Sequence, residues 1–348
     1  MRLSSVEVIP YALPFKQPYV TARGTLRQRE MVLLRVRDED GVVGLGEAVP
    51  LSLRGGVSLE HVVKELEEFA EHQETEGLSA PAHCAVTMAQ VDLLGRRAGN
   101  GGGVEAGALA CNATLVAGPP ADVAADAERW AQDGFTTFKL KLGAETAKTR
   151  TEQGILRSRD ADVAQVGAVR EALGPEARIR VDANEAWDLE VAKRTLAELE
   201  PLGIELAEQP VAGLEAMAEL AASTSIPLAA DESVTSLAEA ERAVALGACA
   251  YTGIKLSKVG GPEAALAIAD VLPAYVTSAL DGPVGIAAAA RVAQAIDAEL
   301  AHGLATQRLF ASTVAAVECD LRNGKLHLPP GPGLGVDIDE DALQAHRL

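Results

Sequence analysis

The chain has 348 residues, a formal net charge of −19 at pH 7, and 48% hydrophobic but only 3% aromatic residues. This length fits one barrel of about 250 residues together with a smaller domain, and the apolar content excludes a disordered chain. The acidic balance argues against a nucleic-acid partner, which would favour a basic face.

The sequence also gives no sign of a membrane protein. No stretch of about 18 apolar residues is free of charges or helix breakers, so we expect no transmembrane helix and no membrane partner. The first residues lack a basic segment followed by an apolar run, so we expect no signal peptide and a cytoplasmic location. The four scattered cysteines show no metal-ligand spacing and predict free thiols.

The first third of the chain predicts an antiparallel sheet followed by two helices. Strands are expected at residues 3–13, 29–37 and 42–47, and helices at 59–71 and 82–97. The turn Asp-Glu-Asp-Gly before the third strand indicates a hairpin. We therefore expect an α+β capping domain over residues 1–107 that ends in a glycine-rich linker.

From residue 108 onward, short β-type runs alternate with amphipathic segments such as 162–173 and 189–199. The runs are CNATLVAG, FTTFKLKLG, ARIRVDANEAW, GIELAEQP, IPLAADESV, AYTGIKLSKVGG, AYVTSAL and LAHGLATQ. Eight strands separated by helical patterns indicate parallel βαβ units that close into a barrel, expected over residues 108–310. The tail, 311–348, is partly Pro/Gly-rich and is expected to return to the first domain.

Three acidic residues each end a predicted barrel strand: Asp182, Glu208 and Asp231. Each is about one strand–helix unit from the next, which places them on three successive strands at the end where barrel active sites form. Three carboxylates that converge there would repel one another without a cation, and oxygen ligands suit Mg²⁺. Taken singly, each residue could instead be a helix cap or a loop charge.

Lysines are expected to face these carboxylates. Lys139 and Lys141 are two residues apart on the second strand, so both point to the same face. Lys255 lies at the end of the sixth strand, across the barrel from the second. A lysine base needs a lowered pKa, which burial, a nearby cation or a second lysine can provide. Lys258 is left open, with a plain loop charge as the alternative to a role in the site.

Metal and opposed lysines form a constellation suited to removing a proton next to a carboxylate. Other chemistries have less support: no histidine shows metal-ligand spacing, and no GxSxG is present. Two alternatives stay open, a Schiff-base aldolase with Lys255 as nucleophile and a non-catalytic barrel.

The sequence resembles the enolase superfamily, muconate-lactonizing subgroup, over nearly its whole length. FKLKLG, RVDANEAW, EQP, ADES and IKLSKVGG carry the resemblance, together with GLGEA early in the chain and GPGLGVD in the tail. The family has a capping domain and a modified (β/α)₇β barrel of the TIM type, so the resemblance implies an α/β fold of that kind. It also implies Mg²⁺, for which Mn²⁺ can substitute, bound by Asp182, Glu208 and Asp231. Lys141 would be a base, Lys139 would lower the pKa of Lys141, and Lys255 would be the partner across the substrate.

Within the subgroup, TSALDGPVGIAAAARVAQAI and AHGLATQRLF resemble the actinobacterial o-succinylbenzoate synthases. That family dehydrates a cyclohexadiene carboxylate that carries a succinyl chain, a step of menaquinone synthesis, so the expected partner is a small-molecule carboxylate. The resemblance places substrate contacts at Thr277, Ser278, Asp281 and Gly285. In the first domain, arginines 23, 27, 29 and 54 are candidates for a specificity loop, and Arg27 is the one we select.

Some positions depart from this pattern. Glu185 follows DAN where the family usually has a small residue, and Gly282-Pro283 follows Asp281 where serine or threonine is more usual. An N-succinylamino acid racemase, or another epimerase or cycloisomerase of the subgroup, would use the same metal and lysines. Dipeptide epimerases carry Asp-x-Asp at the eighth strand, whereas this chain has Ala305-Thr306-Gln307.

Overall fold

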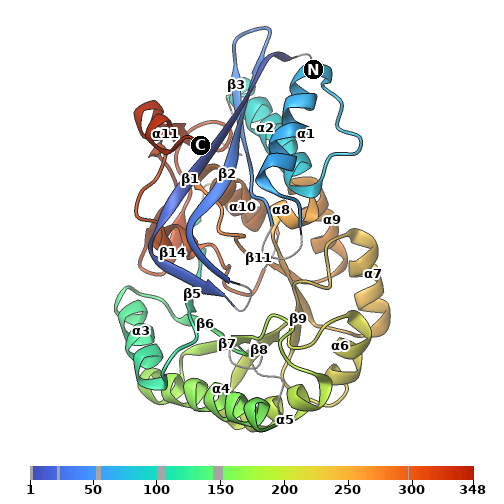
Figure 1. Cartoon of the computed structure of the whole chain (residues 1–348), viewed down its shortest axis with the longest axis vertical. Coiled ribbons are helices and arrows are strands. Elements are labelled where there is room, and N and C mark those ends of the chain that lie inside the picture. The colour runs from blue at the N-terminus through green and yellow to red at the C-terminus, as the bar shows by residue number, and fades with distance from the viewer. Residues whose placement is uncertain (1–2, 22–23, 52–55, 100–106, 144–151, 297) are drawn as a thin grey trace.

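The computed structural model describes residues 3–21, 24–51, 56–99, 107–143, 152–296 and 298–348. Figure 1 shows a sheet with two helices at one end of the molecule and a ring of strands and helices at the other. Both ends of the chain lie beside the first sheet. In the described part of the chain, no helix is long and apolar enough to span a bilayer.

The capping sheet has the predicted hairpins. It is antiparallel, with strand order β1 (Leu3–Thr21), β2 (Gly24–Asp38) and β3 (Val43–Ala48). β1 extends eight residues beyond the predicted end, and β2 begins five residues before the predicted start. Helices α1 (Leu59–His72) and α2 (Ala80–Arg97) follow, close to their predicted bounds.

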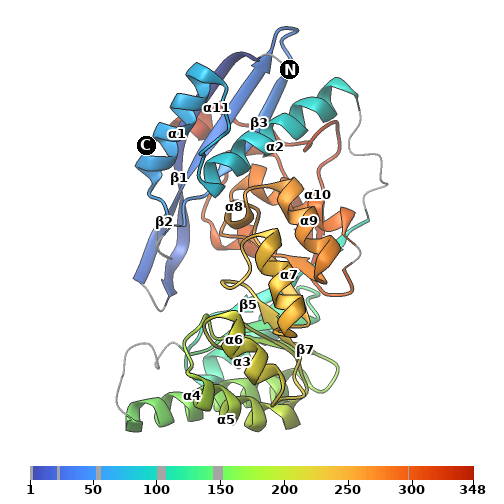
Figure 2. The ribbon, with the colours of Figure 1, turned by 90° about the vertical axis from the view of Figure 1, so that its right-hand side faces the viewer.

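The middle of β2 is buried on both faces of the capping sheet. Along β2, Val32 and Leu34 pack against α1 and α2, whereas Met31 and Leu33 join the larger core shared with the barrel. All four side chains are fully buried. Because successive side chains of a strand point to opposite faces, β2 contributes side chains to two apolar cores. Figure 2 shows α1 and α2 beside the sheet and α8–α10 between the cap and the rest of the barrel.

The barrel sheet is parallel, with neighbouring strands in the order of the sequence from β5 to β11. Its strands are β5 (Asn112–Leu115), β6 (Thr137–Lys141), β7 (Arg178–Asp182), β8 (Ile204–Glu208), β9 (Leu228–Ala230), β10 (Tyr251–Ile254) and β11 (Ala274–Val276). The helices that cover or connect them are α3 (Pro120–Gln132), α4 (Glu152–Leu173), α5 (Leu189–Leu199), η2 (Glu200–Leu202), α6 (Leu214–Ala221), α7 (Leu237–Leu246), α8 (Leu256–Val259), α9 (Pro262–Val271) and α10 (Pro283–Ala295).

The eighth strand is much shorter than predicted. Of the run 300–307, only two residues bridge the sheet in parallel: His302 pairs with Cys111 beside β5, and Gly303 pairs with Thr277 beside β11. These two bridges join the edges of the sheet and close the barrel. The chain then turns into η3 (Ala305–Leu309), a 3₁₀-helix that redirects it toward the cap, where Phe310 pairs with Phe15. The fold is thus an α/β, TIM-like barrel with a separate α+β cap.

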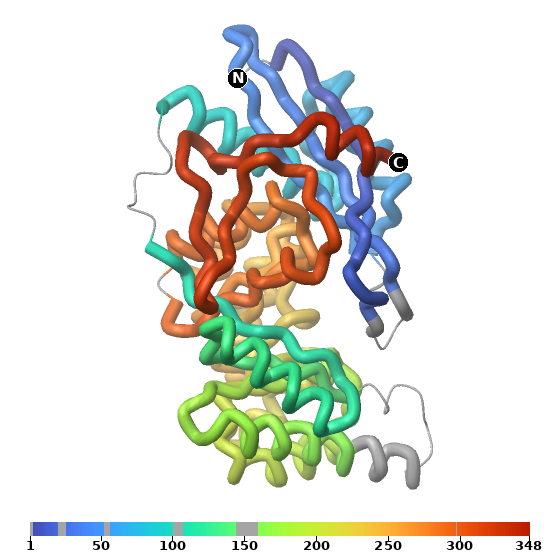
Figure 3. The backbone as a smooth tube through the Cα atoms, turned by 90° about the vertical axis from the view of Figure 1, so that its left-hand side faces the viewer, coloured from blue at the N-terminus to red at the C-terminus, as the bar shows by residue number. Residues whose placement is uncertain are grey.

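The tail returns to the first part of the chain, as Figure 3 shows. Its elements are β12 (Ala315–Val317), β13 (Asp320–Arg322), β14 (Lys325–His327), β15 (Asp337–Ile338) and α11 (Glu340–His346), and β14 pairs with β4 (Leu109–Ala110). The Arg35 guanidinium lies 2.5 Å from a Glu340 oxygen, and the Leu348 amide donates to the Pro10 carbonyl at 3.1 Å. Residues 100–106 of the predicted glycine-rich linker lie outside the described residues, and the domain border after residue 107 stays a prediction.

Candidate active site

The three predicted acidic residues lie together at one end of the barrel sheet. Asp182 and Glu208 are the last residues of β7 and β8, where they are direct register partners, and Asp231 immediately follows β9. All three are at most 1% exposed. Parallel strands end at the same edge of a sheet, and this geometry brings the carboxylates into one buried group.

Lys139 and Lys141 project from β6 to the same face, as their spacing predicts. The Lys139 ammonium lies 2.9 and 3.1 Å from the two Glu208 oxygens and 3.1 Å from Asp182. Lys141 forms an ion pair with Asp182 and donates to the Asn184 side-chain oxygen at 2.9 Å. Two lysines therefore bound the carboxylate group on the β6 side.

Two further lysines bound the same group on the β10 side. Lys255, directly after β10, is 9% exposed and forms an ion pair with Asp231. Lys258 lies in α8, and its ammonium is 2.8 Å from the other Asp231 oxygen. Of the two readings left open for Lys258, the loop charge does not hold, because the short helix α8 turns its side chain back onto Asp231 at the end of β9. We define the strand-end cluster as Lys139, Lys141, Asp182, Glu208, Asp231, Lys255 and Lys258.

The ion pairs in the strand-end cluster determine its protonation. Burial by itself raises the pKa of Asp182, but Lys141 and Lys139 outweigh it and hold the pKa below its ordinary value. Burial lowers the pKa of Lys139, but Glu208 and then Asp182 outweigh it and raise the pKa above its ordinary value. Both groups are therefore charged at neutral pH.

The donor chemistry of the strand-end cluster fits a divalent cation. Three buried carboxylates from adjacent strands offer hard oxygen ligands, and each already contacts positive charge from a lysine. Among the described residues, no three His, Cys, Asp or Glu side chains are arranged closely enough to hold a metal ion. In the structure each of the three carboxylates faces a lysine instead.

The predicted substrate contacts lie in two places. Thr277, Ser278 and Asp281 are buried or partly buried in the loop after β11, and Gly285 lies in the first turn of α10. Ser278 donates to an Asp281 oxygen at 2.7 Å, and the Asp281 amide donates back at 2.9 Å. Arg27 is exposed on β2.

The remaining candidate arginines differ in placement. Arg29 is buried and donates to the Pro50 and Ala279 carbonyls at 2.9 and 3.0 Å, which ties β2 to the loop after β11. Arg23 and Arg54 fall outside the described residues.

A carboxylate that the sequence reasoning missed joins the cap to this loop. Glu47, at the end of the GLGEA motif, is fully buried, and the Gly282 amide donates to it at 2.7 Å. The Tyr11 hydroxyl donates to its second oxygen at 2.8 Å. Burial and the neighbouring Asp281 raise the pKa of Glu47 to about 8. The only sequence signal was a single acid at the end of an apolar strand.

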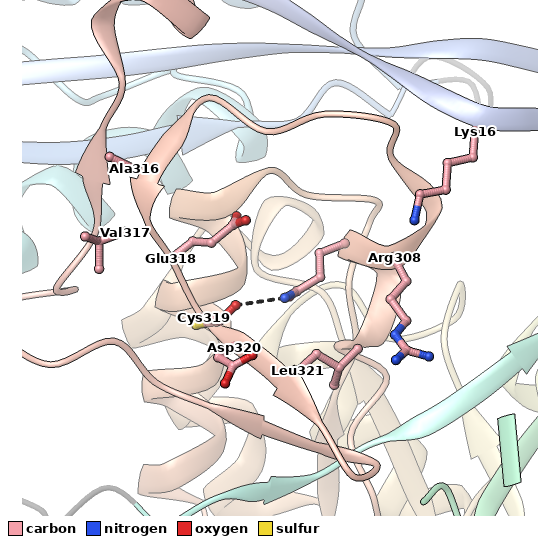
Figure 4. Close-up of a pocket in the computed structure, with 9 residues that line it drawn as sticks. Lys16, Arg308, Ala316, Val317, Glu318, Cys319, Asp320 and Leu321 are labelled. Carbon is pink, nitrogen blue, oxygen red and sulfur yellow. Dashed lines mark hydrogen bonds between the residues drawn. The ribbon is translucent and has the colours of Figure 1, made fainter. Parts of the chain in front are cut away.

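A cavity of about 570 Å³ opens elsewhere, between the cap, η3 and the tail (Figure 4). Lys16, Gln307, Arg308 and residues 316–321 line it, and none of the strand-end cluster does. Arg308 is already held by Asp133 at 2.5 Å and lies over the Trp130 ring. This cavity therefore holds none of the residues predicted to carry the chemistry.

Known protein families match both parts of the chain. Residues 4–101 match the mandelate racemase / muconate lactonizing enzyme N-terminal domain, and residues 122–342 match the enolase C-terminal domain-like family. A chloromuconate cycloisomerase from Pseudomonas putida is 28% identical over 99% of this chain and 98% of its own length.

Two further relatives bear on chemistry. An o-succinylbenzoate synthase from Thermobifida fusca is 38% identical over 206 residues, which are 58% of this chain and 61% of that protein. A dipeptide epimerase from Cytophaga hutchinsonii, solved in complex with Mg and the dipeptide D-Ala-L-Val, has a TM-score of 0.87 and 26% identity. That match covers 99% of this chain and 98% of the other.

Proposed function

Because this chain belongs to the mandelate racemase / muconate lactonizing enzyme family of the enolase superfamily, we propose that it is an o-succinylbenzoate synthase. Its substrate is then 2-succinyl-6-hydroxy-2,4-cyclohexadiene-1-carboxylate, an intermediate of menaquinone synthesis. The observation that carries the proposal is the strand-end cluster, in which buried carboxylates lie between lysines from β6 and lysines from the end of β10. The identity to the Thermobifida fusca synthase supports the choice of substrate.

The lysines have distinct roles in this proposal. Lys141 takes the proton from the ring carbon that carries the carboxylate, and the electron pair left behind forms an enediolate. The hydroxyl on the neighbouring carbon then leaves as water by taking that proton back from the Lys141 ammonium, so Lys141 is neutral again and the ring becomes aromatic. Lys139 holds Glu208 and Asp182 beside Lys141. Lys255 offers its positive charge from the opposite side.

Asp182, Glu208 and Asp231 are the residues that would hold Mg²⁺, or Mn²⁺ in its place. When bound, such an ion supplies positive charge that stabilises the negative charge developing on the substrate carboxylate.

Substrate recognition is assigned to the loop after β11 and to the cap. Thr277, Ser278, Asp281 and Gly285 are proposed to contact the succinyl group, and Arg27 to contact the substrate from β2. A buried Thr277 hydroxyl without a hydrogen-bond partner among the described residues supports this role, since it leaves one polar group available. The reaction is proposed to take place in the cytoplasm, where its product can be used.

The test is an ultraviolet assay that follows loss of the diene absorbance with Mg²⁺ and with EDTA. Turnover that requires metal and disappears in Lys141→Ala is the expected result. Lys16→Ala, an exposed lysine of β1, is the matched control and should keep full activity. Dehydration that survives in Lys141→Ala contradicts the assignment of the base.

A second candidate is an N-succinylamino acid racemase. Lys255 favours it, because a buried lysine across the cluster from Lys141 can serve as the second base that racemisation needs. In deuterated water, a racemase should show that Lys141→Ala and Lys255→Ala each retain α-proton exchange with only one stereoisomer, opposite in the two variants. A dehydratase shows no such complementary pattern.

A further inference from the structure

A tyrosine in the barrel interior donates a hydrogen bond to Glu208, a member of the strand-end cluster. Tyr275, the middle residue of β11, is fully buried, and its hydroxyl donates to Glu208 Oε2 at 2.6 Å. β11 and β8 are separated in the sheet by β10 and β9, so this bond crosses the barrel interior. The ring packs in a small buried group with Leu206 and Ala229.

The tyrosine ring is itself held in place. The Arg180 guanidinium carbon lies 5.1 Å from the ring centroid, at cation–π distance. Arg180 is fully buried, and it is fixed by Glu205 at 2.5 Å and by the Ala301 carbonyl at 2.7 Å. The hydroxyl therefore has little freedom to leave Glu208.

Glu208 receives two kinds of donor that act differently on it. Lys139 contacts both carboxylate oxygens at nearly equal distances, 2.9 and 3.1 Å, and so holds the Glu208 carboxylate toward β6. Tyr275 adds a directional bond to one of these oxygens, and the two donors together restrict rotation of the carboxylate. A buried hydroxyl needs a partner, and here that partner is a proposed metal ligand.

We propose that Tyr275 is a positioning residue, which orients the Glu208 carboxylate for binding of a divalent cation. This inference rests on the proposed function, because it takes Glu208 as a cation ligand. Groups that hydrogen-bond to metal ligands typically change metal affinity by about 10- to 100-fold when they are removed. Tyr275→Phe deletes the hydroxyl and keeps the ring against Arg180.

The experiment measures Mn²⁺ binding to the whole protein without substrate, from the electron paramagnetic resonance signal of free Mn²⁺. The dissociation constant of Tyr275→Phe should rise by about 10-fold. Tyr251→Phe is the matched control, because Tyr251 packs against the same buried group, and its affinity should equal that of the wild type. Removing the hydroxyl in a Glu208→Gln background should cause no further change.

A second measurement leaves every tyrosine hydroxyl in place and so does not depend on how a variant folds. With 3-fluorotyrosine at all four tyrosines, the fluorine resonance of residue 275 should shift on addition of Mg²⁺, and that of Tyr11 should not. The inference is overturned if Tyr275→Phe binds Mn²⁺ as tightly as the wild type, or if the fluorine resonance of residue 275 does not move. Either result leaves the proposed function standing. Wild-type protein that binds no Mn²⁺ overturns the metal site and the inference with it.

Discussion

The buried Glu47 makes the stability of the protein depend on pH in an unusual direction. The pKa of Glu47 rises from an ordinary 4.5 to about 8, with burial as the largest cause and Asp281 as the next. The Tyr11 hydroxyl and the Gly282 amide donate hydrogen bonds to Glu47. The negative charge of Glu47 also acts to raise the pKa of the nearby Arg29 and Cys84. Replacing Glu47 with glutamine removes the titration and nearly keeps the shape.

The sign follows from which state holds the proton more tightly. Below pH 4.5 the carboxyl is protonated in both the folded and unfolded chain, so its contribution to stability is fully present. Between pH 4.5 and 8 the unfolded chain loses the proton and the folded chain keeps it, so stability falls as pH rises. Each pH unit corresponds to about 1.4 kcal/mol, which gives about 4 kcal/mol between pH 5 and pH 8.

The assay is urea unfolding of wild type and Glu47→Gln at pH 5, 6, 7 and 8, followed by circular dichroism. The variant should gain about 4 kcal/mol of stability relative to wild type across this range. Glu67→Gln, an exposed carboxyl of α1, is the control and should track the wild type. A difference between Glu47→Gln and wild type that stays constant with pH refutes the reasoning.

Three further predictions concern packing, metal and thiols. A Cβ at residue 46 would lie 1.9 Å from the Ala85 carbonyl, so Gly46→Ala should lower the free energy of unfolding by about 3 kcal/mol; Gly107→Ala, which meets nothing, should be neutral. Mg²⁺ at 100 times its dissociation constant should raise the free energy of unfolding by about 2.7 kcal/mol. This appears as a rise in Tm that EDTA reverses and that Asp182→Asn abolishes. Burial raises the pKa of Cys111 and Cys319 to about 12, so these thiols should react with a disulfide reagent only after unfolding; fast reaction in the native protein contradicts this.

The sequence predicted those features that depend on local pattern. Apolar runs that end in an acid located Asp182, Glu208 and Asp231, because a strand, a helix and the next strand recur at nearly constant spacing. The two-residue spacing of Lys139 and Lys141 predicted their common face, since side chains alternate along a strand. The four cysteines are free, as expected.

The features that were missed depend on contacts between distant parts of the chain. Glu47 meets Gly282 across 235 residues, and Tyr275 meets Glu208 across 67. No spacing rule links such pairs, because their meeting depends on how the cap docks and how the barrel closes. The eighth strand was overestimated for a related reason: after Gly303 the chain leaves the sheet to reach the cap, which an apolar pattern alone does not reveal.

The two-sided burial of β2 has a consequence for how its pairing is specified. In a half-exposed strand, a slip of one residue moves apolar side chains into water, and that cost fixes the register. A slip along Met31–Leu34 would exchange one apolar face for another, so polarity offers no such resistance. The register is specified toward the strand end, where Arg37 is exposed beside the buried Val36 and an Asp38 oxygen accepts from the Asp40 and Val42 amides at 3.0 and 2.9 Å. The turn therefore aligns the capping sheet, and the shape of the core side chains keeps it aligned.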